Sequence, residues 1–222
     1  MKITPRVSQR RSIRLKGYDY SQSGAYFVTI CTKSRELYFE KYRELQEIVK
    51  RQWEELPQRF LGLILDEFII MPNHIHGVLI VGAGLAPALS GLAPALSGQS
   101  RENVGATLAV AQNNGAGARP GAGARPGAGA RPAPTVGEIV GTFKSLCIHS
   151  WLAYIKEKKI DVVGKFWQRN YYDHIIRNED ELNKIREYIQ NNPLKWDLDK
   201  ENPGRTGVDV LEEEIFQTQK RS

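Results

Sequence analysis

The chain has 222 residues, of which 41% are hydrophobic and 25% are charged, proportions that are ordinary for a globular protein. It contains no run of about 18 apolar residues, so we expect no membrane-spanning helix. The basic N-terminus has no apolar stretch behind its charges, so we do not expect a secretory signal. Cys31 and Cys147 lie far apart in apolar surroundings, which predicts two reduced thiols in a cytoplasmic protein.

The net charge of +6 is unevenly distributed. Residues 1–24 carry a net charge of +5 and residues 82–133 one of +3, so all other residues together carry −2. A basic arm over 1–24 favours a polyanion such as nucleic acid, although a solubilising tail would have the same composition. The arm mixes cations with aromatic rings, a pattern suited to phosphates and unstacked bases. The predicted DNA-binding residues there are Arg10, Arg11, Arg14, Lys16, Tyr18 and Tyr20.

The first half of the chain predicts two strands around a helix, then a third strand. "AYFVTICTK" at 25–33 is rich in aromatic and β-branched residues, which favours a strand. Residues 42–56 place apolar side chains at helical spacing. "LGLILDEFII" at 61–70 predicts a strand, the following Met-Pro-Asn a turn, and "HIHGVLIV" at 74–81 the antiparallel partner strand.

Residues 82–133 interrupt this pattern with low-complexity sequence. "GLAPALS" occurs twice in succession and "GAGARP" three times in tandem. Gly, Ala and Pro offer little apolar area to offset the entropy of an ordered backbone. We therefore predict a disordered or extended insert within one domain.

The second half resumes the pattern after the insert. Thr135, with Glu three residues later, has the spacing of a capping box and starts a long amphipathic helix. Residues 164–177 contain a strand, and Asn178 starts a second helix, again with Glu three residues later, which Pro193 stops. Residues 197–222 form a polar tail, whose acidic stretch we expect to fold back over a basic groove.

The resulting order is β-α-β-β-α-β with an added C-terminal helix. That order is typical of the split, ferredoxin-like α+β fold. We predict a single domain built from residues 25–81 and 134–196.

The stretch "MPNHIHGVLI" at 71–80 places two histidines in an apolar strand. Side chains alternate along a strand, so His74 and His76 point to one face and Ile75 to the other. Two imidazoles on one face can share a divalent metal ion. The alternative is a pair of histidines on a solvated sheet face.

The last predicted helix carries an apolar stripe and, beside it, a polar one. At 100° per residue the polar stripe consists of Glu181, Lys184, Tyr188 and Asn192. The phenol of Tyr188 is a weak nucleophile at neutral pH and needs an electrophile polarised by a metal, such as a phosphodiester on Mg²⁺. The histidine pair with an amide oxygen of Asn192 would bind that ion. A tyrosine that only packs at the core boundary is the alternative.

Three segments together resemble the single-tyrosine (Y1) transposases that carry a histidine–hydrophobic–histidine motif. They are "MPNHIHGVLI", "GKFWQRNYYDHIIRNEDEL" and "IREYIQNNPLKW", within residues 17–81 and 134–196. The family includes IS200-like transposases, and the segments are most similar to its REP-associated tyrosine transposases. No single segment is specific, but the three in this order are.

The resemblance implies a role for each matching position. His74 and His76 match the metal-binding pair, with Mg²⁺ or Mn²⁺ as the ion, and Tyr188 matches the nucleophile that forms a 5′-phosphotyrosine link. Asn192 matches the third protein ligand, where IS200-type enzymes more often carry glutamine. The resemblance also implies that the N-terminal region helps to read the foot of a DNA hairpin.

Other polar residues have two interpretations each. Tyr171 and Tyr172 compete with Tyr188 as the nucleophile, but only Tyr188 has the helical offset to Asn192. Trp167 either stacks on a base or anchors a turn in the core, and His174 either lies near the metal or ends a strand. The predicted DNA-binding residues of this half are Gln168, Arg169 and Lys184.

We therefore expect an enzyme that cleaves and rejoins single-stranded DNA at hairpin, REP-like sequences in DNA transposition. It would be an endonuclease and strand transferase, working as a monomer or a homodimer. Two alternatives stay open: a hairpin-binding protein that does not cleave, and a metal-dependent phosphodiesterase that uses water. A covalent protein–DNA adduct distinguishes the first hypothesis from both.

Overall fold

A four-stranded antiparallel sheet forms the centre of the chain. The computed structural model describes residues 23–82 and 134–217. The sheet order is β2-β3-β1-β4, and every neighbouring pair is antiparallel. The strands are β1 (Gly24–Cys31), β2 (Leu63–Met71), β3 (His74–Val81) and β4 (Tyr172–Ile176). With the helices between them, this is the split β-α-β-β-α-β arrangement, so the predicted ferredoxin-like α+β fold is confirmed.

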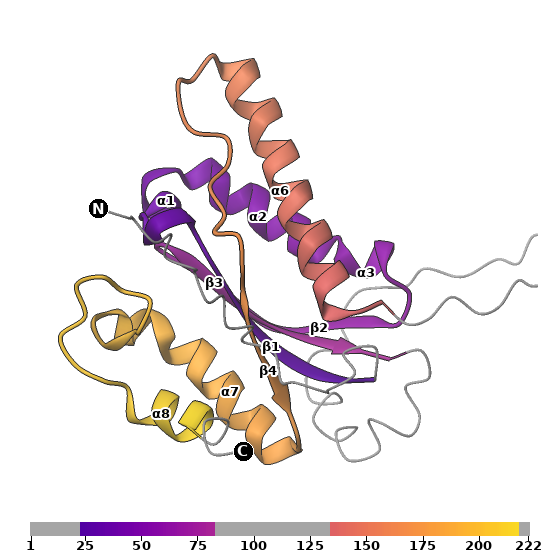
Figure 1. Ribbon diagram of the computed structural model, residues 1–222, viewed down its shortest axis with the longest axis vertical. Helices are drawn as coiled ribbons and strands as arrows, with labels where there is room; N and C mark the ends of the chain where they lie inside the picture. Colours follow the sequence, from indigo (N-terminus) through magenta and orange to yellow (C-terminus); the bar gives the residue numbers. More distant parts are fainter. Residues whose placement is uncertain (1–22, 83–133, 218–222) are drawn as a thin grey trace, which may run out of the picture.

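Helices cover both faces of this sheet, as Figure 1 shows. On one face lie α1 (Tyr38–Lys41), α2 (Arg43–Glu54), α3 (Leu56–Arg59) and α6 (Val136–Lys158). On the other face lie α7 (Glu179–Asn191), η2 (Asn192–Leu198) and α8 (Val210–Gln217). Each face has its own buried hydrophobic cluster, because strand side chains alternate between the two layers of helices.

The strand ends differ from the sequence-based predictions by a few residues. β1 stops at Cys31 rather than at residue 33, because Thr32 makes only an isolated bridge to Trp167 before the 3₁₀ turn η1 (Lys33–Arg35). The β2–β3 hairpin turns at Pro72 and Asn73, as predicted, and pairs Met71 with His74. Within the predicted segment 164–177, only β4 enters the sheet.

The two long helices start where the sequence predicts. Thr135 makes a full capping box with Glu138 at the start of α6. Asn178 caps α7 by accepting a hydrogen bond from the Glu181 backbone N–H at 2.9 Å. The Glu181 carboxylate does not complete a second box, because it accepts from the Arg177 backbone N–H at 2.7 Å and contacts His174.

A close contact fixes α2 against the sheet. Gly77 of β3 faces the α2 layer, and an added Cβ there would lie 2.4 Å from Cζ2 of Trp53. The Trp53 ring is 2% exposed and stacks on Phe68 at a centroid distance of 4.7 Å. Glycine is therefore required by the close approach of the indole, rather than by the backbone conformation.

Several sequence-based predictions concern segments outside residues 23–82 and 134–217. They are the N-terminal arm with its DNA-binding residues and the insert at 82–133. The C-terminal segment, expected as a polar tail, forms η2 and α8, and α8 buries Ile215 in the cluster under α7. Cys31 and Cys147 are free thiols. Among the described residues, none of the helices has the length and apolar character to cross a membrane.

Candidate metal and tyrosine site

The two histidines of β3 point to the α7 face of the sheet, as the alternation predicts. Both imidazoles are fully buried, and their Nε2 atoms lie 2.9 Å apart. Ile75, between them, is buried in the opposite cluster. Ligand atoms in neighbouring positions of an octahedral ion, each about 2.1 Å from it, lie about 3 Å apart. The pair therefore has the spacing of two ligands of one metal ion.

The orientation of the His74 ring is fixed by Asn73 in the hairpin turn. The Asn73 amide group donates from Nδ2 to the backbone oxygens of Glu201, at 2.7 Å, and Arg35, at 3.1 Å. Oδ1 of Asn73 must therefore face Nδ1 of His74, 2.8 Å away, and accept its proton. The neutral His74 ring then carries its lone pair on Nε2, where a metal would bind.

The Nδ1 atom of His76, like that of His74, has a polar neighbour. Nδ1 of His76 lies 2.9 Å from the hydroxyl of Thr29 on the neighbouring strand β1. Thr29 and His76 are directly paired in the sheet register, so the backbone itself sets this contact. Burial lowers the pKa of both histidines, that of His74 strongly, which keeps the rings neutral and able to act as ligands.

A carboxylate that the sequence analysis did not identify completes this group. Oδ2 of Asp199, in the segment after η2, lies 3.5 Å from Nε2 of His74 and 3.8 Å from Nε2 of His76. The three ligand atoms lie within 4.8 Å of one another, and all three residues are buried. Burial opposes ionisation of Asp199, but its contacts with His76 and His74 keep its pKa below the usual value.

The polar groups present fit a divalent metal ion. Asp199 Oδ2 is a buried oxygen without a hydrogen bond of good geometry among the described residues, and it lies near Nε2 of both imidazoles. A buried carboxylate without a compensating charge is costly, and a cation between these three atoms would remove that cost. The two histidines and the aspartate could therefore bind a metal.

Tyr188 lies next to this group. Its hydroxyl is 3.4 Å from Nε2 of His76, and the two rings are 5.3 Å apart. The side chain is only 2% exposed, although it belongs to the predicted polar stripe of α7. Burial raises the pKa of Tyr188 well above its usual value; the carboxylates of Glu212 and Asp199 add to this, and the Asn192 amide opposes it.

Asn192 is buried at the end of α7, one turn after Tyr188. Its Oδ1 atom has no hydrogen-bond partner among the described residues, so it is another buried oxygen without a partner near the tyrosine. The predicted role of Asn192 as a metal ligand stays a prediction.

The C-terminal helix α8 covers the tyrosine. The Phe216 ring packs at 5.7 Å from that of Tyr188 and at 5.1 Å from that of Phe27 on β1. Ile215 is 4% exposed in the same cluster. Three ion pairs join the helix and its flanking residues to the surrounding segments: Lys184–Glu214, Lys195–Asp209 and Lys200–Glu212. The acidic stretch thus lies over the tyrosine and neutralises lysines around it.

The remaining predicted residues occupy several different places. Trp167 is 7% exposed in the hydrophobic cluster under α6, which favours the turn-anchor interpretation. Gln168 and Arg169 are exposed in the loop before β4. Lys184 is an exposed residue of α7. His174 is the middle residue of β4 rather than a strand end, and its Nε2 atom lies 2.8 Å from Oε1 of Glu181, outside the metal group.

The other two tyrosines differ in their surroundings. Tyr171 is half-buried against the α6-side cluster, whereas Tyr172 lies on the same face as the histidines. Its ring packs at 6.5 Å from Phe27 and at 5.8 Å from Phe216. Among the three candidate tyrosines, the structure gives a hydroxyl contact with the histidine pair for Tyr188.

Two solved structures have folds similar to this chain. One is a REP-associated tyrosine transposase bound to a REP hairpin, 12% identical, with a TM-score of 0.44 over 79% of this chain and 69% of that one. The other is a candidate transposase from Deinococcus radiodurans, 18% identical, with a TM-score of 0.36 over 80% of this chain and 95% of that one.

Sequence comparison gives a closer relationship. No family model matches the chain. A protein of Haemophilus influenzae, described as uncharacterized, is 34% identical over 201 residues, which cover 87% of this chain and 93% of that protein. With this identity over nearly the whole length of both proteins, the chain belongs to the same family as the Haemophilus influenzae protein.

Proposed function

We propose that this protein is a metal-dependent, transposase-like enzyme that cleaves and rejoins single-stranded DNA at hairpins. The observation that carries the proposal is the short distance, 3.4 Å, between the Tyr188 hydroxyl and Nε2 of His76. A tyrosine beside a buried group of two histidines and an aspartate has the parts for attack on a phosphodiester.

His74, His76 and Asp199 would hold the ion, with Asn192 as a further ligand. The ion, Mg²⁺ or Mn²⁺, would supply Lewis acidity at the scissile phosphate when bound. The carboxylate of Asp199 and the amide oxygen of Asn192 are ligand types that suit Mg²⁺ and Mn²⁺. The hydrogen bond from His74 to Asn73 keeps the ring in the tautomer that such an ion requires.

Tyr188 would attack phosphorus, lose its proton and form a 5′-phosphotyrosine link. The bond to the 3′-oxygen of the other strand segment breaks, and this oxygen takes up a proton. A 3′-hydroxyl then attacks the phosphotyrosine and releases Tyr188, so the strand is rejoined. The burial of Tyr188 on α7 supports this role, since the phenol is held beside the ligand group.

Hairpin DNA is the proposed substrate because of the motif resemblance to REP-associated tyrosine transposases. The basic arm at 1–24 supports it, since its net charge of +5 suits a phosphate backbone. Gln168, Arg169 and Lys184 would add contacts from the folded domain. The enzyme would act as a monomer or a homodimer.

Covalent capture tests the proposal. The full chain is incubated with labelled single-stranded hairpin DNA and Mn²⁺ or Mg²⁺, and the adduct is separated under denaturing conditions. We expect an adduct with the wild type and with Tyr172→Phe, the matched control, and none with Tyr188→Phe. An adduct that persists in Tyr188→Phe would rule out Tyr188 as the nucleophile.

A hairpin-binding protein that does not cleave is the second candidate. The observation that favours it is the burial of Tyr188 under Phe216, together with the raised pKa of its hydroxyl. Tight hairpin binding without an adduct or cleavage products, with either ion, would establish this candidate. Cleavage without an adduct that survives Tyr188→Phe would instead indicate a phosphodiesterase that uses water.

A further inference from the structure

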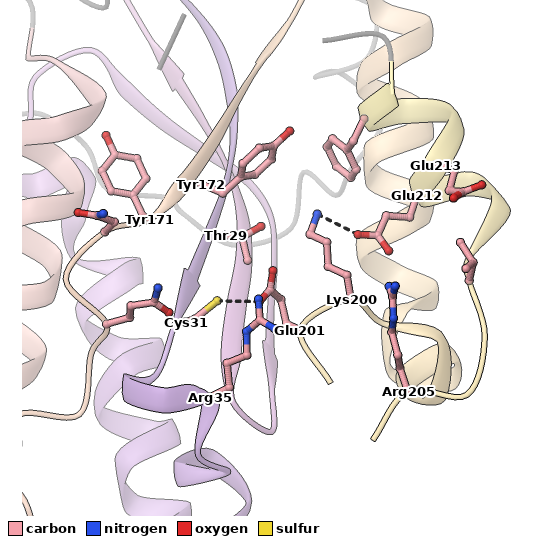
Figure 2. Close-up of a pocket in the computed structure, with 14 residues that line it drawn as sticks. Thr29, Cys31, Arg35, Tyr171, Tyr172, Lys200, Glu201, Arg205, Glu212 and Glu213 are labelled. Carbon is pink, nitrogen blue, oxygen red and sulfur yellow. Dashed lines mark hydrogen bonds and ion pairs between the residues drawn. The ribbon is translucent and has the colours of Figure 1, made fainter. Parts of the chain in front are cut away.

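A cavity of about 510 Å³ lies beside the metal group, on the same face of the sheet. Figure 2 shows it between the edge of the sheet, where Tyr171 and Tyr172 lie, and the C-terminal segment, which brings Lys200, Glu201 and Arg205. Its volume is in the range of small-molecule sites, too small for a duplex and suited to one small ligand or one nucleotide.

The cavity shares two of its walls with the metal group. Thr29 lines it and also contacts Nδ1 of His76. Glu201 lines it, and its backbone oxygen accepts the hydrogen bond that orients Asn73 against His74. The cavity therefore adjoins the residues that contact the Nδ1 side of both histidines. For a DNA strand with its scissile phosphate at the metal group, the cavity is the position of a neighbouring nucleotide.

The loop that forms one side of the cavity is held firmly by its backbone. The Gln168 N–H donates to the Cys31 oxygen of β1 at 2.9 Å, and the bridge between Thr32 and Trp167 adjoins this contact. The Lys144 ammonium of α6 donates to the backbone oxygens of three consecutive residues, 168–170. A loop fixed in this way can present side chains without paying to order its backbone when a ligand binds.

Two carboxamide side chains of this loop line the cavity and are exposed, those of Gln168 and Asn170. A carboxamide has a donor and an acceptor side by side, which matches the paired donor and acceptor on the edge of a base. Bases can be read on these edges when they are unpaired and turned out of a stack.

Three cations and three carboxylates line the cavity, and among the described residues Arg205 and Glu213 are the two that belong to no ion pair. Arg35 is paired with Glu201 at 2.8 Å, and Lys200 with Glu212 at 2.8 Å. Arg205 lines the cavity and is exposed, and its guanidinium has no ion pair within residues 23–82 and 134–217. An arginine without an internal carboxylate partner can bind a phosphate without first breaking an ion pair.

We infer that this cavity holds one unpaired nucleotide next to the scissile phosphate, with Gln168 and Asn170 reading its base and Arg205 binding its phosphate. Lys144 is then a positioning residue, because it acts through the loop backbone. The inference rests on the proposed function, that single-stranded DNA is the ligand and that its scissile phosphate lies at the metal group.

Base preference tests the reading of the nucleotide. Hairpin oligonucleotides carry each of the four bases, or an abasic site, at every unpaired position flanking the stem. Their dissociation constants from the full chain are measured by fluorescence anisotropy with Mn²⁺. We expect the wild type to prefer one base at one position by about tenfold, and the double variant Gln168→Ala, Asn170→Ala to reduce this below about threefold.

The control variant is Gln58→Ala, an exposed glutamine of α3 on the opposite side of the sheet. It should keep the full preference, and the double variant should keep the wild-type affinity for the abasic oligonucleotide. An unchanged preference in the double variant, or a wild type without any preference, overturns the inference while leaving the adduct test untouched. A chain that binds none of the oligonucleotides overturns the inference and the proposed function together.

Salt dependence tests the phosphate contact separately. Arg205→Ala should weaken binding equally for all bases and lower the slope of log affinity against log salt by about 0.7, the value for one phosphate contact in a single strand. The exposed Arg59→Ala on α3 should leave the slope unchanged. An Arg205→Ala slope equal to that of the wild type would remove Arg205 from the site.

Discussion

Replacing Asp199 by Asn should weaken metal binding strongly with little change in shape. Asp199 Oδ2 lies 3.5 and 3.8 Å from the two imidazole Nε2 atoms, and it is the carboxylate of the three-residue group. Loss of an outer-shell partner of a ligand typically reduces metal affinity 10- to 100-fold. Loss of a charged ligand should exceed this, so we expect at least about 100-fold, or about 2.7 kcal/mol.

Titration calorimetry with Mn²⁺ on the full chain measures this effect, and the neighbouring exposed Asp197→Asn is the matched control. Asn192→Ala tests the other candidate ligand, and it should cost less than Asp199→Asn because it removes no charge. An Asp199→Asn protein that binds Mn²⁺ within threefold of the wild type, with Asp197→Asn unchanged, would refute the reasoning. If Asn192→Ala loses more Mn²⁺ affinity than Asp199→Asn does, Asn192 rather than Asp199 is the main third ligand.

Three further perturbations address the fold and the covered site. Gly77→Ala should lower the free energy of unfolding by about 1–3 kcal/mol in urea titrations, because the new Cβ would lie 2.4 Å from the buried Trp53 ring. Asp66→Asn should cost about 1–2 kcal/mol at pH 7, because it breaks the ion pair with Arg186. Burial of Asp66 opposes ionisation, but the Arg186 contact outweighs burial and lowers the pKa of Asp66. The loss of stability in Asp66→Asn is therefore present above pH 4 and shrinks as the pH falls below 4. A stability difference between the two proteins that stays constant down to pH 2 would contradict this. Deleting residues 210–222 should raise the rate of covalent adduct formation severalfold, because α8 covers Tyr188, and an unchanged rate would show that α8 does not limit access.

The sheet and the histidine pair could be predicted because both follow from local rules. Alternation along a strand is a property of the backbone, so His74 and His76 share a face whatever surrounds them. The two-residue turn before them sets the register of the hairpin. The ends of the strands were less predictable, since the end of β1 depends on a bridge between Thr32 and the distant Trp167.

Asp199 could not be predicted from a spacing, because no local pattern connects it to the histidines. It lies more than a hundred residues after His76, in an irregular segment behind η2. What brings it there is the C-terminal segment, which folds back along the face of the sheet and is fixed when Asn73 donates to the Glu201 oxygen. A weak signal exists in the sequence, since a carboxylate that follows the tyrosine helix is a candidate ligand on chemical grounds.

The position of Tyr188 shows where helical periodicity stops being informative. Counting 100° per residue separates Tyr188 from the apolar stripe of Leu182, Ile185 and Ile189, yet all four are buried in one cluster. The reason is α8, which packs against the side of α7 that carries Tyr188. Without α8, that side of α7 would be exposed to solvent. A phenol with a raised pKa under an aromatic cover suits a site that must open before it reacts. The same helix brings Glu212 to Lys200, beside the proposed nucleotide cavity, so opening would free a cation there as it uncovers the tyrosine.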